Sequence, residues 1–136
     1  MPIGAVVASD SVTATVTMGD LGSTFGGGPV PCAAALATLD VIEAEGLLAN
    51  ADDVGAYITA GARKLGSAKV LDVQGCGLLL GLRLARPAVE VQRALFGKRV
   101  LTGTSADPAV LRLLPPLSFS RQEADLLLAA LTEVVA

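Results

Sequence analysis

The sequence contains no histidine and no tryptophan, and only 3% of its residues are aromatic. Without histidine, the chain by itself holds no Ser-His-Asp triad, no Cys-His dyad and no His-based metal site. The two cysteines, Cys32 and Cys76, match no zinc-ligand spacing, so no metal is expected. Their apolar, small-residue surroundings favour two buried, reduced thiols in a cytoplasmic protein.

Charge is also scarce: 17% of the residues are charged, against 52% hydrophobic residues. Ten Lys and Arg residues form no run and the net charge is −3, so no nucleic-acid partner is expected. No basic secretory leader is present, and the uncharged stretch 21–39 is broken by glycines and prolines, so no membrane span is expected either. Such an apolar chain is expected to bury part of its surface in a larger assembly.

The second half of the sequence predicts alternating helices and strands. Asn50 is expected to cap a helix that ends near Lys64, and Ser120 with Glu123 forms a capping box for the last helix. Between them, the pattern predicts strands at 70–84, 100–104 and 110–114, with a helix at 87–96. Gly75 and Gly77 interrupt the first of these strands, either as a bulge or as a tight bend. We therefore predict an α/β fold in which helices cover one face of a small, mostly antiparallel sheet.

The first 48 residues do not fit naturally into that sheet. Residues 1–8 read as a buried strand and residues 11–18 as a second extended piece. A helix is expected from about Pro31 to Gly46, and its alanine-rich surface predicts burial on several sides. We therefore divide the chain into residues 1–48, the tail of a different domain, and residues 49–136, a small α/β domain.

A glycine-rich loop, "GSTFGGG" at residues 22–28, opens this helix. Loop amides and the hydroxyls of Ser23 and Thr24 are suited to hold a phosphate at a helix start. The loop is neither a dinucleotide fingerprint nor a P-loop, since no lysine follows the last glycine. An ordinary flexible turn is the alternative.

Several stretches, in the same order along the chain, resemble the class III pyridoxal-phosphate aminotransferases, in particular their acetylornithine and ornithine branch. The matching stretches are "PIGAVVAS" (2–9), "GSTFGGGPVPCAAALATLDVIEAEGLL" (22–48), "VQGCGLLLGLRL" (73–84) and "VLTGTSADPAVLRLLPPLSFSRQEAD" (100–125). The resemblance implies the end of a large domain that binds pyridoxal 5'-phosphate (PLP), followed by the small carboxyl-terminal domain. PLP is therefore the expected cofactor.

The resemblance also assigns roles to individual residues. Thr24, with Ser23 beside it, matches the residue that reaches the cofactor phosphate across a dimer interface, and the alternative is a turn cap. Arg112 matches the arginine that binds a substrate carboxylate, and the alternative is a solvent-facing edge residue. No catalytic residue is expected in the chain, because none of its three lysines matches the lysine that forms the Schiff base with PLP; these lysines are Lys64, Lys69 and Lys98.

The expected function is that of the carboxyl-terminal part of an aminotransferase. The resemblance favours acetylornithine aminotransferase, which transfers an amino group between N-acetylornithine and 2-oxoglutarate in arginine biosynthesis, as a cytoplasmic homodimer or beside a full-length homologue. Succinylornithine, ornithine and 4-aminobutyrate stay open as amino donors. The alternative is an interaction or regulatory module that kept the fold and lost catalysis.

Overall fold

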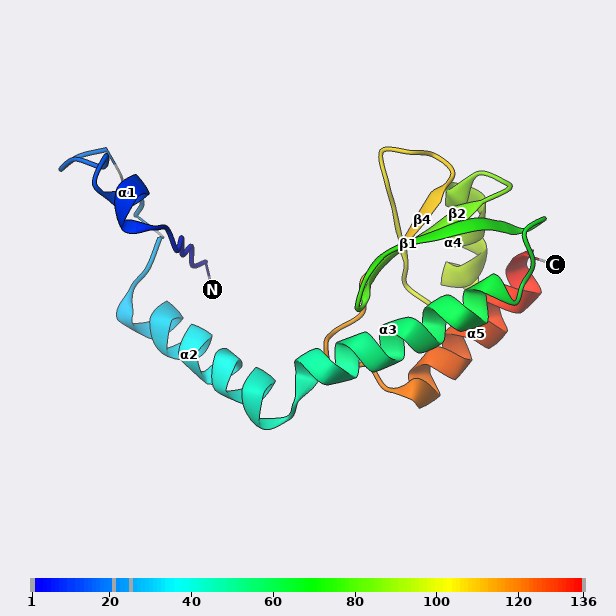
Figure 1. Cartoon of the computed structure of the whole chain (residues 1–136). Coiled ribbons are helices and arrows are strands. Elements are labelled where there is room, and N and C mark those ends of the chain that lie inside the picture. Colours follow the sequence, from blue (N-terminus) through cyan, green and yellow to red (C-terminus); the bar gives the residue numbers. More distant parts are fainter. Residues whose placement is uncertain (1, 21, 25, 136) are drawn as a thin grey trace. The chain divides into compact units, whose positions relative to one another are not determined.

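The structure is a computed structural model that describes residues 2–20, 22–24 and 26–135. The chain divides into two compact units, Met1–Glu45 and Gly46–Ala136. The elements of the second unit are α3 (Leu47–Arg63), β1 (Val70–Cys76), β2 (Leu79–Leu84), α4 (Ala88–Gly97), β3 (Gly103–Thr104), β4 (Val110–Leu113) and α5 (Arg121–Val135). The strands form one sheet in the order β1-β2-β4-β3 with every pairing antiparallel, which confirms the predicted α/β class (Figure 1).

The core of the second unit lies between one face of the sheet and the helices α3, α4 and α5. Alternate residues of β2 face this core, because successive side chains of a strand point to opposite faces. Leu82 is fully buried, as are Leu111 on β4 and Leu131 on α5. The opposite face of the sheet carries the residues between these leucines, among them Gly81 and Arg112.

Close backbone contacts hold the helices against the sheet and against each other. A β-carbon at Gly55 of α3 would lie 2.1 Å from the carbonyl oxygen of Gly77, so only glycine lets α3 approach the turn between β1 and β2. Asn50, in the first turns of α3, donates its side-chain amide to the carbonyl oxygens of Leu117 (2.7 Å) and Phe119 (3.1 Å). This contact fixes the loop that connects β4 to α5.

Three predictions for the second unit need correction. The expected strand 70–84 is two strands, because its glycine interruption is the tight bend and not the bulge: Gly77 adopts φ +52° and reverses the chain between β1 and β2. Asn50 is not a helix cap, since α3 already begins at Leu47, after Gly46 in a left-handed conformation (φ 62°). The strand expected at 100–104 is only Gly103–Thr104.

The capping box was predicted correctly. The Ser120 hydroxyl accepts a hydrogen bond from the Glu123 N–H at 3.2 Å, and the Glu123 carboxylate accepts one from the Ser120 N–H at 2.7 Å. These two bonds satisfy backbone donors that a helix start leaves without partners, which explains why α5 begins here.

The first unit contains α1 (Asp10–Thr13) and α2 (Pro29–Ala44). The strand expected at 1–8 is wrong for the described residues 2–8, which form none, and the extended piece expected at 11–18 is wrong because α1 and turns replace it. A strand needs a neighbouring strand to bond its amides, and the backbone bond given for this segment joins Gly4 N–H to Gly26 C=O at 3.1 Å. The Thr13 hydroxyl donates to the carbonyl oxygen of Asp10, a bond typical of a helical turn.

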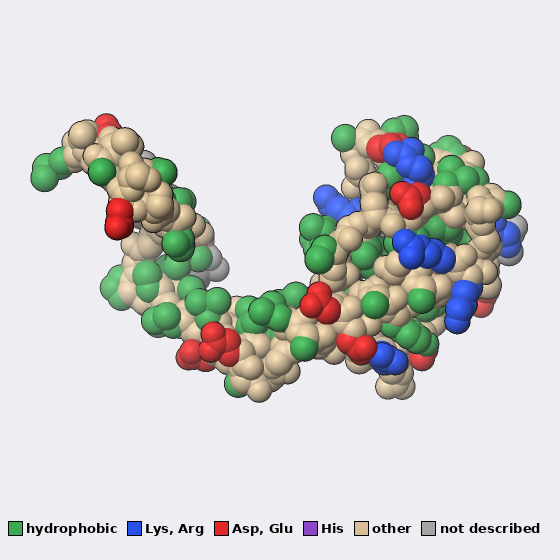
Figure 2. Space-filling view, in the orientation of Figure 1, with side chains coloured by type: hydrophobic (Ala, Val, Ile, Leu, Met, Phe, Trp, Pro, Cys, Tyr) green, Lys and Arg blue, Asp and Glu red, His purple; other side chains and the backbone are tan. Residues whose placement is uncertain are grey.

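Within this chain, α2 is not buried, contrary to the prediction. None of its residues is buried, and Leu36 and Leu39 are 63% and 57% exposed. Figure 2 shows hydrophobic side chains at the surface along this unit. Both cysteines, Cys32 and Cys76, are exposed, so the predicted buried thiols are also wrong for this chain.

Within the described ranges, no helix combines the length and the apolar character that crossing a bilayer requires.

Candidate functional site

The glycine-rich loop forms a tight turn ahead of α2. The Ser23 carbonyl oxygen accepts a hydrogen bond from the Gly26 N–H at 3.3 Å, and a β-carbon at Gly26 would lie 3.1 Å from Ser23 Cβ. Ser23 and Thr24 are exposed, and the Thr24 hydroxyl bonds to no other residue in the described part of the chain. The side chains of Ser23 and Thr24 are therefore at the surface, where a ligand from outside this loop can reach them.

The start of α2 contributes less to an anion site than a helix normally does. Gly28 is the N-cap, and the prolines Pro29 and Pro31 stand in the first turn without an N–H group. Val30, between the two prolines, keeps an N–H group as a donor, whereas the Cys32 N–H is already bonded to the Gly28 carbonyl oxygen at 2.9 Å. Apart from the Val30 N–H, the donors for a phosphate must therefore come from the loop, with Thr24 as the main side-chain donor.

Arg112 lies in the middle of β4 on the face of the sheet that the helices leave open. Its neighbours Leu111 and Leu113 point into the core, so the period of the strand turns Arg112 outward. In register, Arg112 faces Gly81 on β2 and Gly103 on β3. The guanidinium lies over Gly103, since a β-carbon there would be 3.1 Å from Arg112 Nε and Nη2.

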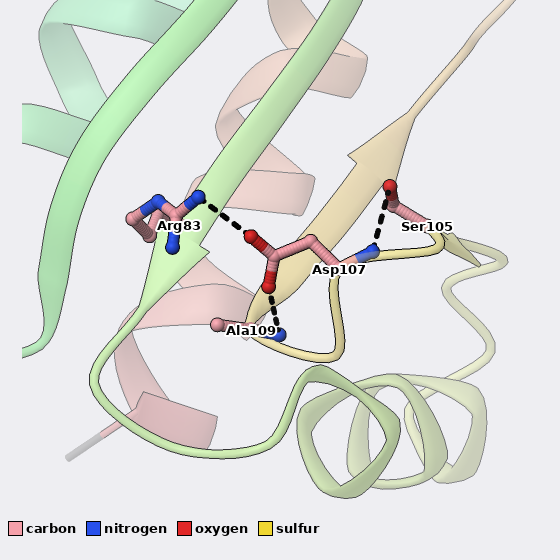
Figure 3. A network of polar contacts seen from close by, with 4 residues as sticks. All are labelled: Arg83, Ser105, Asp107 and Ala109. Atoms are coloured by element: carbon pink, nitrogen blue, oxygen red, sulfur yellow. Dashed lines mark hydrogen bonds and ion pairs between the residues drawn. The ribbon is translucent and has the colours of Figure 1, made fainter.

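Two arginines project from this open face, and only one has a partner. Arg83 forms an ion pair with Asp107 at 2.6 Å, whereas Arg112 has no ion pair with any described residue. Figure 3 shows how Asp107 is held: its carboxylate also accepts the Ala109 N–H at 2.9 Å, and its own N–H donates to the Ser105 hydroxyl. The backbone bond from Ala109, aided by the Arg83 charge, holds the pKa of Asp107 below its ordinary value. Arg112 is therefore the arginine left available for an anion from outside the chain.

A shallow depression of about 350 Å³ surrounds Arg112 on this face. Its floor includes Gly81 and Val110, and Val110 is only 4% exposed although it does not belong to the core under the helices. Its polar side chains are Gln74, Ser105 and Arg112, and no carboxylate is among the described residues that line it. A planar guanidinium above such a floor is suited to a carboxylate, which it binds through two parallel hydrogen bonds.

The predicted site residues lie in different units: Ser23 and Thr24 in the first, Arg112 in the second. Of the three lysines, Lys98 forms an ion pair with Glu133, and Lys64 is the C-cap of α3.

Comparison with known proteins identifies the family. The sequence model of one family, described as "Aminotransferase class-III", matches residues 1–135. The chain belongs to the class III aminotransferases. This family is PLP-dependent, so the cofactor expected from the sequence is confirmed at the level of the family.

Relatives of this aminotransferase chain carry names from one branch. It is 41% identical over 138 residues, or 99% of its length, to "Acetylornithine aminotransferase 1" of Bordetella pertussis, and 35% identical to "Ornithine aminotransferase 1" of Staphylococcus saprophyticus. The solved acetylornithine aminotransferase of Elizabethkingia anophelis matches 95% of the chain with a TM-score of 0.84 at 26% identity. The chain covers 35% of the Bordetella protein, 34% of the Staphylococcus protein and 35% of the solved chain, about a third of each.

Sequence reasoning missed the residues that surround Arg112. Gln74, Gly81 and Gly103 form one row with it across four strands. The row follows from the strand register, and the sequence does not give the register while a bulge and a tight bend at Gly75 and Gly77 both stay open. The usable signal was a glycine in each neighbouring strand, since glycine inside a strand marks a close approach.

Proposed function

We propose that the chain supplies the carboxyl-terminal part of an acetylornithine-type aminotransferase that works in the cytoplasm as a dimer. The family match over residues 1–135 carries this proposal, and the names of the relatives favour N-acetylornithine and 2-oxoglutarate as substrates. In this proposal, residues 1–48 complete the PLP-binding domain and residues 49–136 form the small domain.

The described loop fits one part of PLP, its phosphate. The hydroxyls of Ser23 and Thr24 and the glycine amides supply directed donors, and charge-assisted hydrogen bonds to phosphate are among the stronger ones. PLP, when bound, supplies the electron-withdrawing ring chemistry of amino transfer. The work we assign to Thr24 is to bind and orient the phosphate.

Arg112 holds and orients a substrate carboxylate in this proposal. Its guanidinium has no ionic partner in the described chain and lies at the depression on the open face of the sheet. A hydrogen bond to a charged group contributes about 1.5–3 kcal/mol, so two such bonds make Arg112 the main anchor of a carboxylate.

A chimaeric enzyme tests the proposal. In the Bordetella pertussis relative, the segment that matches this chain is replaced by the 136 residues of this chain, hereafter the chimaera. We expect it to form glutamate from 2-oxoglutarate and N-acetylornithine, with a higher kcat/KM than with succinylornithine, ornithine or 4-aminobutyrate. A chimaera that folds and binds PLP but transfers no amino group would contradict the proposal.

A second candidate is an interaction module without catalysis. The observation that favours it is the exposed apolar surface of α2, including Val30, Leu36 and Leu39. In this case, the 136-residue chain co-purifies with a full-length relative as a defined heterodimer, and the chimaera is inactive although folded. An active chimaera decides for the first candidate.

A further inference from the structure

We infer that Gln74 is a second carboxylate-binding residue, which acts with Arg112 from the opposite side of Gly81. The inference rests on the proposed role of Arg112 and specifies how the carboxylate lies. Both carboxylate oxygens accept hydrogen bonds from the guanidinium, and the Gln74 Nε2–H group donates to the second lone pair of one of these oxygens. The ligand class is a small carboxylic or 2-oxo acid whose carboxylate rests on the open face of the sheet.

The strand register places the two side chains on either side of a gap. Gln74 on β1 pairs with Gly81 on β2, and Gly81 pairs with Arg112 on β4. Neighbouring strands lie about 4.8 Å apart, so the β-carbons of Gln74 and Arg112 are about 10 Å apart, and β2 places no side chain between them. Both side chains are exposed and long enough to reach a carboxylate above Gly81; the Arg112 guanidinium, which lies over Gly103 in the structure, turns toward Gly81 when it binds one.

The Gln74 side chain already leans into this gap. A β-carbon at Gly81 would lie 3.2 Å from both Gln74 Cγ and Gln74 Nε2, and 3.1 Å from Val110 Cγ1. The amide thus lies beside the bare backbone of Gly81, at the wall of the depression that Arg112 also lines. Glycine at position 81 keeps the floor flat, and any side chain there would occupy the place of the carboxylate.

The charges of the depression favour an anion and leave the Gln74 amide available. Gln74 is exposed, and its side chain makes no hydrogen bond to another described residue. The hydroxyl oxygen of Ser105, the other polar residue of the lining, accepts a hydrogen bond from the Asp107 N–H at 3.4 Å. The nearby acid Asp107 is paired with Arg83, so within the described lining a ligand carboxylate meets donors and no competing carboxylate.

Binding of glutarate to the full 136-residue chain tests the inference by NMR. We expect glutarate, and not the neutral glutaramide, to shift the side-chain signals of Gln74 Nε2 and Arg112 Nε together. Gln74→Leu is expected to raise the Kd for glutarate about tenfold, the effect of one hydrogen bond to a charged group. Gly81→Ala is expected to weaken binding although both donors are retained.

Matched variants separate the inference from the proposed function. Gln122→Leu changes an exposed glutamine on α5 outside the depression and is expected to leave the Kd unchanged. Dispersed amide spectra show that each variant is folded. If Arg112→Gln abolishes binding while Gln74→Leu leaves the Kd unchanged, the inference is wrong and the role of Arg112 stands. If neither variant changes the Kd, or glutarate shifts no side-chain signal, both are wrong.

Discussion

Among the helical glycines Gly55, Gly61 and Gly97, Gly55 is the position where a single methyl group should be least tolerated. A β-carbon on this residue of α3 would lie 2.1 Å from the carbonyl oxygen and 2.5 Å from the carbonyl carbon of Gly77. These atoms belong to the backbone of the turn between β1 and β2, so they cannot move aside by a change of side-chain rotamer. Gly55→Ala must therefore push α3 away from the sheet or distort the turn.

The magnitude follows from two opposing terms. Alanine in a helix interior is favoured over glycine by about 1 kcal/mol, whereas overpacking a core costs about 1–3 kcal/mol and more where backbone must move. Because the clash is with backbone, we expect the second term to exceed the first and Gly55→Ala to lower the free energy of unfolding by about 2 kcal/mol or more.

Two other helical glycines serve as controls. A β-carbon at Gly61 would meet the side chain of Leu128, with 2.4 Å to its Cδ1, and that side chain can rotate away. Gly97, the last residue of α4, has nothing within 4 Å of the same position. We expect Gly61→Ala to stay within about 1 kcal/mol of the wild type and Gly97→Ala to be neutral or slightly stabilising.

Urea unfolding of the 136-residue chain, followed by far-UV circular dichroism, measures these differences. With a slope of about 1–3 kcal/mol per molar urea, a loss of about 2 kcal/mol moves the midpoint of Gly55→Ala down by about 0.7–2 M. An unchanged or raised midpoint for Gly55→Ala would refute the close packing of α3 against the Gly77 turn.

Three further predictions follow from contacts of single side chains. Asn50→Leu removes two hydrogen bonds to the loop before α5 and should lower the free energy of unfolding by about 2 kcal/mol in urea, whereas an unchanged midpoint would show that the loop is held otherwise. Backbone hydrogen bonds, from Ala109 to Asp107 and from Ser120 to Glu123, lower the pKa of both acids, so their contribution to stability is complete above the ordinary carboxyl pKa and is lost as pH falls through the lowered values. The urea midpoint of the wild type should therefore decrease when the pH is lowered below about 4, and it should decrease less in the Asp107→Asn, Glu123→Gln double variant. Equal pH profiles of the midpoint in the two proteins would contradict this assignment. Thr24→Val in the chimaera should raise the Kd for PLP about tenfold, measured by absorbance titration, while Thr24→Ser should restore binding; equal affinity in all three proteins would remove Thr24 from the phosphate site.

Much of the second unit was predictable because its signals are local. The Ser120–Glu123 capping box and the apolar neighbours of Arg112 each fix a feature within a few residues, a helix start and an outward side chain. The interruption at Gly75 and Gly77 was recognised, but the sequence left a bulge and a tight bend open, and the left-handed conformation of Gly77 decides for the bend. The predicted α/β class does not depend on this choice, because a bulge or a bend changes the number of strands while the helices still cover one face of the sheet.

The first unit was predicted less well for a different physical reason. Residues 2–8 have the composition of a buried strand, but the described chain provides no strand beside them. Leu36 and Leu39 of α2 are likewise typical core residues, but they are exposed because the described chain has no second layer that covers them. Composition predicts that a segment is suited to burial, but the partner that buries it must be present for the prediction to hold.

The most direct test of the account is the KM for 2-oxoglutarate of the chimaera with Arg112→Lys. Lysine keeps the charge but loses the fork that binds both carboxylate oxygens, so we predict that KM rises about tenfold or more. The PLP absorbance and the unfolding midpoint should not change, and Arg93→Lys, which alters an exposed arginine of α4, should leave KM unchanged. An Arg112→Lys enzyme with the KM of the parent chimaera would contradict the claim that this residue holds the substrate.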